Sequence, residues 1–474
     1  MVKLTIFNIQ NLAAQNPWWA DKQGLAQDFQ YRRYIASDIR WIPELINDFN
    51  LDKDCLYTLR GPRQVGKSTT LKIIINKLLS SLDNRRRVFF YACDLIQNEN
   101  ELADLIRSYI ELVSLQTAER KYIFLDEVSQ IRNWQKALKH LWDTGMFDGC
   151  SVIVTGSHSL DIKAGGELMP GRRGAVNDPD KVLLPLCFRE YIGLLRPEES
   201  EDIPRVKLSR DPLQIRQLVS ELSAFAGRIT RYNHQFDDYL MTGGFLTSIN
   251  SFLNRRIEPY VYDTYLQWIK GDFLKAGKSE AYLCQITANI LSTMGTPVSW
   301  NALLKNSNIG SHHTVHDYVD TLEDTFVARS YHKYDPGRKQ PFYGKNKKIY
   351  VRDPFLYHAL HGWAGRVQDI CTLSVQTLAH SPTTGVLVES VVAEHLERYN
   401  PKGIYYWKNH REIDFVTADA SGLLPIEVKY QRSIGQEDLR ELDKFGYGIL
   451  LSMDTLALKG DIAIIPVSLF LAML

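Results

Sequence analysis

The sequence predicts a protein of the α/β class whose first domain is built on a parallel sheet. Four apolar runs typical of buried strands lie at 56–60, 88–93, 122–126 and 151–156, and segments of helical pattern separate them. A glycine-rich loop follows the first run, and two acidic residues follow the third. Strands that alternate with helices favour a three-layer core in which helices cover a parallel sheet.

The loop after the first strand has the spacing of a phosphate-binding loop, GxxxxGK(S/T). Its glycines let backbone N–H groups fold around phosphate oxygens, and the helix that follows adds its favourable dipole. Lys67 is expected to bridge the β- and γ-phosphates of ATP, and the Ser68 hydroxyl to bind Mg²⁺. The alternative is a glycine turn that matches by accident. The expected nucleotide contacts are Gly61, Pro62, Arg63, Gln64, Val65, Gly66, Lys67, Ser68 and Thr69.

Two acids end the third apolar run, Asp126 and Glu127. Ligands of doubly wound sheets bind at the carboxyl ends of the strands. We expect Asp126 to hold Mg²⁺ through water and Glu127 to polarise the attacking water, which makes Glu127 and Lys67 candidate catalytic residues. Acids at strand ends are common on protein surfaces, so this interpretation depends on the loop.

The fourth strand ends in small polar residues, of which Ser157 is the candidate sensor of the γ-phosphate. The alternative for Ser157 is an ordinary turn at the end of a strand. The glycine-rich segment 162–178 follows and is predicted to be a loop that carries Arg172 and Arg173.

Composition restricts the class of protein. A chain of 474 residues with 45% hydrophobic and 23% charged residues is expected to fold into two to four globular domains. The net charge of +1 gives no global attraction to nucleic acid, so a DNA surface must be a local patch. Six scattered cysteines, no signal peptide and no apolar run of about 18 residues predict a cytoplasmic protein with no membrane partner. The apolar tail at 462–471 is predicted to form a final strand and a packed helix.

Pattern changes along the chain predict five segments. A helix is expected to begin near Pro43, before the first strand. The predicted segments are an N-terminal extension (1–50), a P-loop ATPase core (51–185), a helical lid (186–275), a winged-helix domain (276–365) and a second α/β domain (366–474).

The winged helix is predicted from three helical runs, at 281–293, 299–306 and 311–319, and two strand-like pieces, at 327–334 and 347–351. Such a domain presents its third helix to a DNA groove and its hairpin to phosphates. The alternative is a module for protein contacts. The expected hairpin cations are Arg338, Lys339, Lys345, Lys347 and Lys348, interleaved with Phe342 and Tyr343, and the helix histidines His312, His313 and His316 are interpreted as solvated rather than as metal ligands.

The last segment holds a second candidate site. Asp414 and Glu427 fall at the ends of predicted neighbouring strands, Lys429 follows on the same face as Glu427, and Glu389 lies in a helical stretch before them. Two carboxylates can bind Mg²⁺ and a lysine can orient a nucleophile, which predicts a nuclease-type site. The alternative is a solvated strand on which acids and lysines alternate.

These motifs resemble those of a large prokaryotic family of AAA-type ATPases, often called archaeal ATPases, whose C-terminal domain has no known function. The resemblance covers nearly the whole chain and rests on Asn16–Trp19, Gly61–Ser68, Leu125–Val128 with Trp134, Thr155–Ser157, Pro170–Arg172, Pro185–Tyr191, Gly243–Phe245, Lys348–Asp353 and the Glu389, Asp414, Glu427 and Lys429 set.

The resemblance implies an AAA+ core, a winged helix and a restriction-endonuclease-like domain of the PD-(D/E)xK type. It also implies that an arginine from a neighbouring subunit completes the ATP site. Arg172 matches the family's loop arginine, although Arg173 beside it leaves the choice open. Ser68 stands where family members commonly have threonine, which is chemically equivalent.

Two functions follow as hypotheses. The first is an ATP-hydrolysing, ring-forming homo-oligomer that binds branched or single-stranded DNA and remodels or cleaves it. The second is a nucleotide-gated switch in defence or signalling, whose C-terminal domain binds DNA or protein without cutting. A transcription regulator built around the winged helix is a third possibility, against which the two sets of catalytic residues argue.

Overall fold

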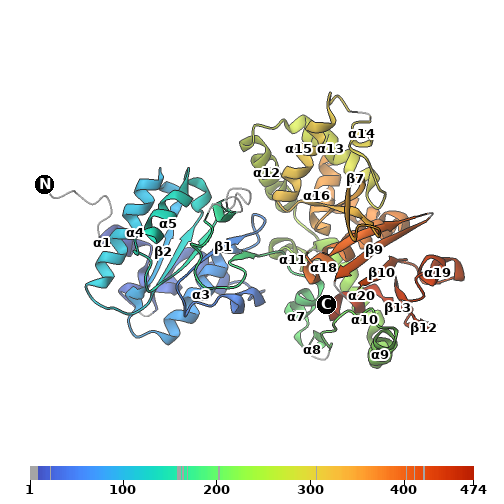
Figure 1. Cartoon of the computed structure of the whole chain (residues 1–474), viewed down its shortest axis with the longest axis horizontal. Helices are drawn as coiled ribbons and strands as arrows, with labels where there is room; N and C mark the ends of the chain where they lie inside the picture. Colours follow the sequence, from blue (N-terminus) through green and yellow to red (C-terminus); the bar gives the residue numbers. More distant parts are fainter. Residues whose placement is uncertain are drawn as a thin grey trace. The chain divides into compact units, whose positions relative to one another are not determined.

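The computed structural model describes residues 9–21, 23–156, 162, 165–167, 169–200, 203–305, 307–401, 403–409, 411–419 and 422–474 (Figure 1). The chain divides into two compact units, residues 1–184 and 185–474, and each contains a sheet. Within the ranges just given, we find no helix with the length and apolar character that a bilayer crossing requires.

The sheet of the first unit has the strand order β2-β3-β4-β1-β5, and every pair in it is parallel. The parallel sheet predicted from the sequence is therefore confirmed. The strands are β1 (Cys55–Arg60), β2 (Val88–Ala92), β3 (Lys121–Asp126), β4 (Cys150–Thr155) and β5 (Asp180–Val182). Every residue of β3 and β4 is buried, as expected for central parallel strands covered on both faces.

Strand order brings the two sequence motifs of this unit together. The phosphate-loop sequence joins β1 to helix α3 (Lys67–Ser81), and of the two acids Asp126 ends β3 and Glu127 follows it. Both β1 and β3 pair with β4 in parallel, so their carboxyl ends lie at one edge of the sheet. The remaining crossovers run through α4 (Glu99–Ser114) and α5 (Trp134–Asp143).

The N-terminal segment covers the edge of this sheet at β2. After α1 (Ile9–Ala14), the Asn16 amide donates to Phe90 O at 2.9 Å and its carbonyl accepts from Phe90 N–H at 2.7 Å. The indole N–H groups of Trp18 and Trp19 both donate to Val88 O, at 3.0 and 2.9 Å. Side chains thus replace the neighbouring strand that β2 lacks, which gives the Asn16–Trp19 motif a structural role. The helix expected near Pro43 is a short 3-10 helix, η3 (Glu44–Asp48).

The sheet of the second unit is mixed and has the order β12-β13-β11-β10-β9-β8-β6-β7. Its strands are β6 (Ala328–Asp335), β7 (Gln340–Val351), β8 (Ile404–Lys408), β9 (Glu412–Asp419), β10 (Gly422–Val428), β11 (Gly448–Ser452), β12 (Ala457–Lys459) and β13 (Ile462–Pro466). The β6–β7 hairpin joins the other strands through one registered pair, Lys333 with Tyr406. The predicted winged-helix and C-terminal segments therefore share one sheet, so residue 366 does not separate two sheets.

Helices surround this mixed sheet. They are α7 (Phe188–Leu195), α8 (Pro197–Ser200), α9 (Pro212–Leu222), α10 (Ile229–Thr242), α11 (Leu246–Phe252), α12 (Pro259–Lys275), α13 (Glu280–Thr293), α14 (Trp300–Leu303), α15 (His312–Asp324), α16 (Pro354–Ala364), α17 (Ile370–Ala379), α18 (Ser381–Tyr399), α19 (Gln436–Asp443) and α20 (Val467–Met473). The helices expected to form a lid belong to the second unit, where α7 packs on α20, and α10 packs on α16 and α20. Residues 462–471 form the predicted strand and buried helix.

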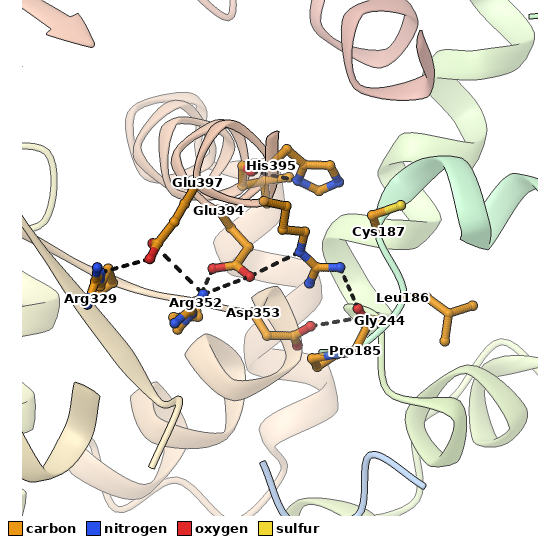
Figure 2. Close-up of polar contacts among 12 residues, drawn as sticks. Pro185, Leu186, Cys187, Gly244, Arg329, Arg352, Asp353, Glu394, His395 and Glu397 are labelled. Atoms are coloured by element: carbon orange, nitrogen blue, oxygen red, sulfur yellow. Dashed lines mark hydrogen bonds and ion pairs between the residues drawn. The ribbon is translucent and has the colours of Figure 1, made fainter. Parts of the chain in front are cut away.

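Hydrogen bonds hold the chain firmly where it enters the second unit (Figure 2). Arg398 of α18 donates to Pro185 O at 2.7 Å, and Phe188 N–H donates to Nε2 of His395 at 2.8 Å. Leu186 N–H donates to Gly244 O at 2.9 Å. This entry segment, Pro185–Phe188, is therefore fixed to α18 and to the loop after α10.

A buried ionic network supports the same helix (Figure 2). Arg352 donates to both oxygens of Glu394, at 2.7 and 3.2 Å, and Arg398 reaches Glu394 at 3.1 Å. Burial alone would raise the pKa of Glu394, but the two guanidinium groups lower it. Asp353, next to Arg352, accepts from Gly244 N–H at 2.8 Å.

Candidate nucleotide site and a second carboxylate cluster

The phosphate loop has a backbone that favours glycine at its last position, directly before α3. Gly66 has φ +101°, and no atom lies within 4 Å of the place where a Cβ would stand. At Gly61 a Cβ would meet Leu183 O at 2.1 Å. The loop is thus closely packed at its start and open at Gly66, directly before α3, where phosphate oxygens could meet backbone N–H groups.

Lys67 is held inside this loop. Its ammonium donates to Gly61 O at 3.0 Å and to Pro62 O at 2.9 Å, and the residue is 6% exposed. The positive charge is therefore fixed within the loop by the loop's own carbonyls. The arrangement suits an anion placed at the N-terminus of α3.

The acids after β3 lie beside the loop, as predicted. Asp126 is buried and forms side-chain hydrogen bonds with Ser68 and Thr155. Burial raises the pKa of Asp126, and these two hydrogen bonds oppose that rise. The Ser68 hydroxyl and the Asp126 carboxylate offer the oxygen ligands that Mg²⁺ prefers, so this pair fits the metal.

Thr155 is a site residue that the sequence reasoning missed. Its hydroxyl donates to Asp126 and accepts from Glu127 N–H at 3.3 Å, so it fixes both acids from the end of β4. Glu127 takes a left-handed backbone, φ 58°, directly after the strand. No local signal in the sequence marks this role, because it depends on β4 lying beside β3 in the sheet. Ser157, the predicted sensor, lies outside the residues that the structure describes.

The two neighbouring arginines beyond β4 have different surroundings. Arg173 is buried and donates to Leu56 O at 2.7 Å, Pro179 O at 3.0 Å and Asp180 at 2.9 Å. The side chain of Arg172 is 30% exposed and pairs with Asp143 at 2.6 Å. Arg173 is therefore part of the core of its own unit, whereas Arg172 is partly exposed at the surface.

A buried lysine of α3 also escaped the sequence reasoning. Lys72 pairs with Asp28 at 2.9 Å, and its ammonium lies 3.2 Å from the centre of the Phe90 ring. Burial lowers the pKa of Lys72, and Asp28 opposes that fall. Asp28 caps helix α2 (Phe29–Ile35), so Lys72 joins this helix to the helix of the phosphate loop.

The second candidate site is assembled in the other unit. Lys429 pairs with Glu427 at 2.7 Å, and Glu427 accepts from Asp414 N–H at 3.2 Å. Asp414 in turn accepts from Val428 N–H at 3.0 Å through its Oδ2. Glu389 of α18 shares a cation with Asp414, so the fold brings all four predicted residues together.

That shared cation is Lys348, which corrects a prediction. We expected Lys347 and Lys348 to contact phosphates from a wing, but both are buried. The ammonium of Lys348 lies 2.8 Å from Glu389, 2.8 Å from Glu412 and 2.9 Å from Asp414. The ammonium of Lys347 stacks 3.3 Å from the centre of the Trp300 ring, and burial lowers the pKa of Lys347 to about 8. Alternation along β7 sends the two lysines to different buried environments.

Crowded carboxylates change the acid–base behaviour of this cluster. Burial, with Asp414 nearby, raises the pKa of Glu389 to about 7 and that of Glu427 to about 8. Burial would also raise the pKa of Asp414, but Lys348 and Lys429 lower it. The Tyr350 hydroxyl donates to Glu389 as well. Asp414 therefore keeps its negative charge at a lower pH than usual, whereas Glu389 and Glu427 bind protons at a higher pH than usual.

The magnesium site predicted on Asp414 and Glu427 stays a prediction, and a cation of the chain itself already contacts Asp414. The point that Glu389, Glu412 and Asp414 share is filled by the ammonium of Lys348. Across the part of the chain that the structure describes, no group of three or more His, Cys, Asp or Glu side chains is arranged to hold a metal ion.

Comparison with known families assigns the first unit. Residues 53–192 match the family described as "AAA domain", and this range includes β1–β5, the phosphate loop and the acidic pair. Residues 233–366 and 384–470 match two families described as domains of unknown function, DUF8612 and DUF4143. The chain therefore contains an AAA-type ATPase domain.

Curated relatives are distant or partial. An uncharacterised protein of Methanocaldococcus jannaschii is 32% identical over 146 residues, which are 31% of this chain and only 29% of that protein's length. An uncharacterised protein of Haemophilus influenzae is 19% identical over 394 residues, covering 80% of this chain and 84% of its own.

Solved structures with similarity include a Walker-type ATPase of Pyrococcus abyssi, with 12% identity, a TM-score of 0.40 and coverage of 65% of this chain and 91% of that one. The ORC2 protein of Aeropyrum pernix follows with 11% identity, a TM-score of 0.36 and coverage of 73% and 92%.

Proposed function

We propose that this chain, whose first unit is an AAA-type ATPase domain, hydrolyses ATP with Mg²⁺ and uses the nucleotide cycle to act on DNA through its second unit. The observation that carries the ATPase part is the gathering of Lys67, Ser68, Asp126 and Glu127 at one edge of the parallel sheet, with Thr155 bonded to both acids.

Each residue of this site has a distinct task. The backbone around Gly66 and the Lys67 ammonium bind phosphate oxygens, and Ser68 with Asp126 would hold Mg²⁺, which neutralises charge that develops on the γ-phosphate. Glu127 accepts a proton from the attacking water. Thr155 restrains the backbone at Glu127 and the carboxylate of Asp126, so it is a positioning residue.

Replacing Glu127 with glutamine tests this assignment. We expect Glu127→Gln to bind ATP as tightly as the wild type and to lose at least about 100-fold in turnover, because a general base contributes at least that much. Binding would be measured with a fluorescent ATP analogue and turnover by phosphate release. Glu111→Gln, on the exposed face of α4, is the matched control. Normal hydrolysis in Glu127→Gln would remove Glu127 from the mechanism.

The β6–β7 hairpin is the surface we propose for DNA. It exposes Arg338 and Lys339 at its turn, and Lys345 with Tyr343, which is 70% exposed, in the bulge of β7 opposite His332 and Lys333. Cations and an exposed aromatic ring suit phosphate contact and base stacking. Helix α15 suits DNA less well, because its exposed histidines alternate with Asp317 and Asp320.

Replacing two exposed lysines of the β6–β7 hairpin with glutamate tests DNA binding. The double variant Lys339→Glu, Lys345→Glu should bind forked, single-stranded and duplex DNA more weakly than the wild type. The slope of log K against log salt should become shallower by about 0.9 for each duplex phosphate that the variant no longer neutralises. Lys459→Glu, an exposed lysine of β12, is the control. Equal affinity and equal slope in the wild type and the double variant would place the DNA surface elsewhere.

One observation favours a DNA-engaging switch over a DNA-cutting enzyme. Lys348 fills the point where a metal ion would bridge the carboxylates of the second unit. We therefore expect no Mg²⁺-dependent nicking that Asp414→Ala and Lys429→Ala abolish. Nicking by the wild type that both substitutions abolish would restore the nuclease hypothesis.

We further propose that the ATPase works as a homo-oligomer in which Arg172 enters the site of the neighbouring copy. The exposed position of Arg172 and the buried position of Arg173 support this choice. Mass measurements with and without a non-hydrolysable nucleotide, on forked DNA, test it. A monomer under all conditions contradicts it.

A further inference from the structure

The carboxylate cluster of the second unit has a filled centre. One ammonium, that of Lys348, lies within 2.9 Å of oxygens from three carboxylates, Glu389 of α18 and Glu412 and Asp414 of β9. An ammonium has three N–H donors. Lys348 uses two of them in hydrogen bonds to Glu389 and Asp414, and its third contact, with Glu412, is an ion pair at 2.8 Å.

The burial of Lys348 means that its charge must be paired inside the protein. Its side chain is completely buried, and a buried charge is tolerated only when it is paired and hydrogen-bonded. A lysine that merely lay near the cluster would extend its ammonium to water. Lys348 instead ends among acids, so the acids and the lysine form one unit.

The carboxylates around Lys348 also accept hydrogen bonds from other groups of the protein. Oδ2 of Asp414 accepts from Val428 N–H, and Glu427 is bonded to Lys429 and to Asp414 N–H. Tyr350 donates to the same oxygen of Glu389 that Lys348 contacts. Charge compensation within the cluster therefore comes from side chains of this chain.

We propose that Lys348 is a built-in cation that stands in for a divalent metal ion at the centre of this cluster, so that the second unit is metal-independent. The lysine links elements that the backbone joins weakly. It reaches from β7 to α18 and β9, whereas β6 meets β8 through a single registered pair. The cluster thus holds the β6–β7 hairpin against the rest of the second unit.

The substitution Lys348→Met tests this, since methionine keeps an apolar stem of similar length and removes the charge. Without the ammonium, the carboxylates of Glu389, Glu412 and Asp414, which are not arranged around a metal ion while Lys348 is present, should close around a divalent cation. We would titrate nucleotide-free protein, stripped of metal with a chelator, with Mn²⁺ and count bound ions by electron paramagnetic resonance. Lys345→Met, an exposed lysine of the same strand, is the matched control.

The expected result is that the wild type, Lys345→Met and Asp414→Asn bind the same number of Mn²⁺ ions. Lys348→Met should bind one more, and the double variant Lys348→Met, Asp414→Asn should lose it. Wild-type Mn²⁺ that disappears in Asp414→Asn would overturn the proposal. A folded Lys348→Met that gains no ion would also overturn it.

If Lys348→Met fails to fold, the comparison of the wild type with Asp414→Asn still tests the proposal. Equal Mn²⁺ counts in the wild type and Asp414→Asn then support the built-in cation, and unequal counts contradict it. Nucleotide is left out because Mg²⁺ or Mn²⁺ at the phosphate loop is expected to enter with ATP. The result is thereby independent of the proposed ATPase activity.

Discussion

Arg172 and Arg173 are adjacent in the sequence and differ in their surroundings at the level of single residues. Four acceptors inside the first unit surround the guanidinium of Arg173, which is buried. Arg172 has one surface partner, Asp143, in a short ion pair, and Pro170 O accepts from it as well. A surface ion pair contributes about 0–1 kcal/mol, so Arg172 can exchange its partner at little cost.

These surroundings predict opposite effects for matched substitutions. Arg173→Met should lower the unfolding free energy of the first unit by about 1–3 kcal/mol, because it leaves the buried carbonyl oxygen of Leu56 without the donor that Arg173 provides. Arg172→Met should leave stability within about 1 kcal/mol and reduce ATP turnover about 10³-fold or more, as expected for a trans arginine. Denaturant unfolding and phosphate release measure the two effects. Full turnover in folded Arg172→Met would exclude it as the trans arginine.

At the scale of elements, the N-terminal segment completes the parallel sheet. A free edge strand offers unpaired N–H and C=O groups to other chains. Here Asn16 binds both backbone groups of Phe90, and Gln15 accepts from Ala92 N–H at 2.8 Å. A short motif thus protects β2 without adding a strand.

Removing the amide of Asn16 should expose this edge. We expect Asn16→Ala to lower the unfolding free energy of the first unit by about 2–6 kcal/mol, since two buried backbone groups lose their partners at about 1–3 kcal/mol each. It should also increase aggregation, measured by light scattering below the melting temperature. Asn100→Ala, an exposed asparagine on α4, should change neither. Unchanged stability of Asn16→Ala would mean that water replaces the amide.

Helix α18 joins two polar centres of the second unit. Glu389 near its middle contacts the Lys348 ammonium, and Glu394, His395 and Arg398 hold the network around the entry segment. Strand β7 carries Lys348 to the first centre and ends beside Arg352 of the second. One helix and one strand therefore place both centres.

The network around α18 predicts a large fall in stability on removing one charge. Arg398→Met leaves Pro185 O without its donor and takes away one of the two arginines that pair with Glu394. The unfolding free energy of the second unit should fall by about 3–5 kcal/mol, the usual effect of breaking a buried pair. Arg440→Met, with its side chain 52% exposed, is the control. A decrease below about 1 kcal/mol would show that Arg352 alone satisfies Glu394.

At the scale of the whole molecule, buried acids in the second unit link its stability to pH. Burial raises the pKa of Asp353 to about 6, of Glu389 to about 7 and of Glu427 to about 8. Between their unfolded and folded pKa values these groups bind more protons in the folded state than in the unfolded state. Stability therefore falls as pH rises through that window. Burial lowers the pKa of His332, His358 and His395 to about 4, so the histidines add stability as pH rises to about 6.5 and little above it.

These opposing effects define the pH range in which the melting temperature should be measured. Between about pH 6.5 and 8 Glu389 and Glu427 lose their protons, and Lys347 opposes their effect only near pH 8, so the melting temperature of the second unit should decrease from pH 6.5 to about 7.5. Glu427→Gln should reduce that decrease, because a neutral amide has no proton to lose. Glu437→Gln, an exposed acid of α19, should leave it unchanged. A melting temperature that rises across the same range would contradict the raised pKa values. Calorimetry of nucleotide-free protein measures it.

Much of the first unit could be predicted because its signals are local. Buried parallel strands are continuous apolar runs, and the loop after β1 and the acids after β3 keep a fixed spacing. Thr155 could not be singled out, because its role depends on β4 lying between β1 and β3. The strand β5 was missed because three residues give too short a pattern.

In the second unit, local sequence patterns predicted the helices and strands but not the contacts between their side chains. The sequence placed the helices and strands of 281–351 and brought out Glu389, Asp414, Glu427 and Lys429. It could not separate Lys347, Lys348 and the exposed Lys345, because all three are the same residue type on one strand. Only the packing of α18 and β9 against β7 decides which lysine meets carboxylates.

The amino-acid sequence alone determined the nucleotide-binding half of this protein, since a phosphate loop is made of consecutive residues whose backbone geometry follows from their glycines. Tertiary structure alone decided the character of the second site. There, residues from α18, β7, β9 and β10 meet in the buried interior, and the charges that share such a volume depend on which side chains the fold brings together.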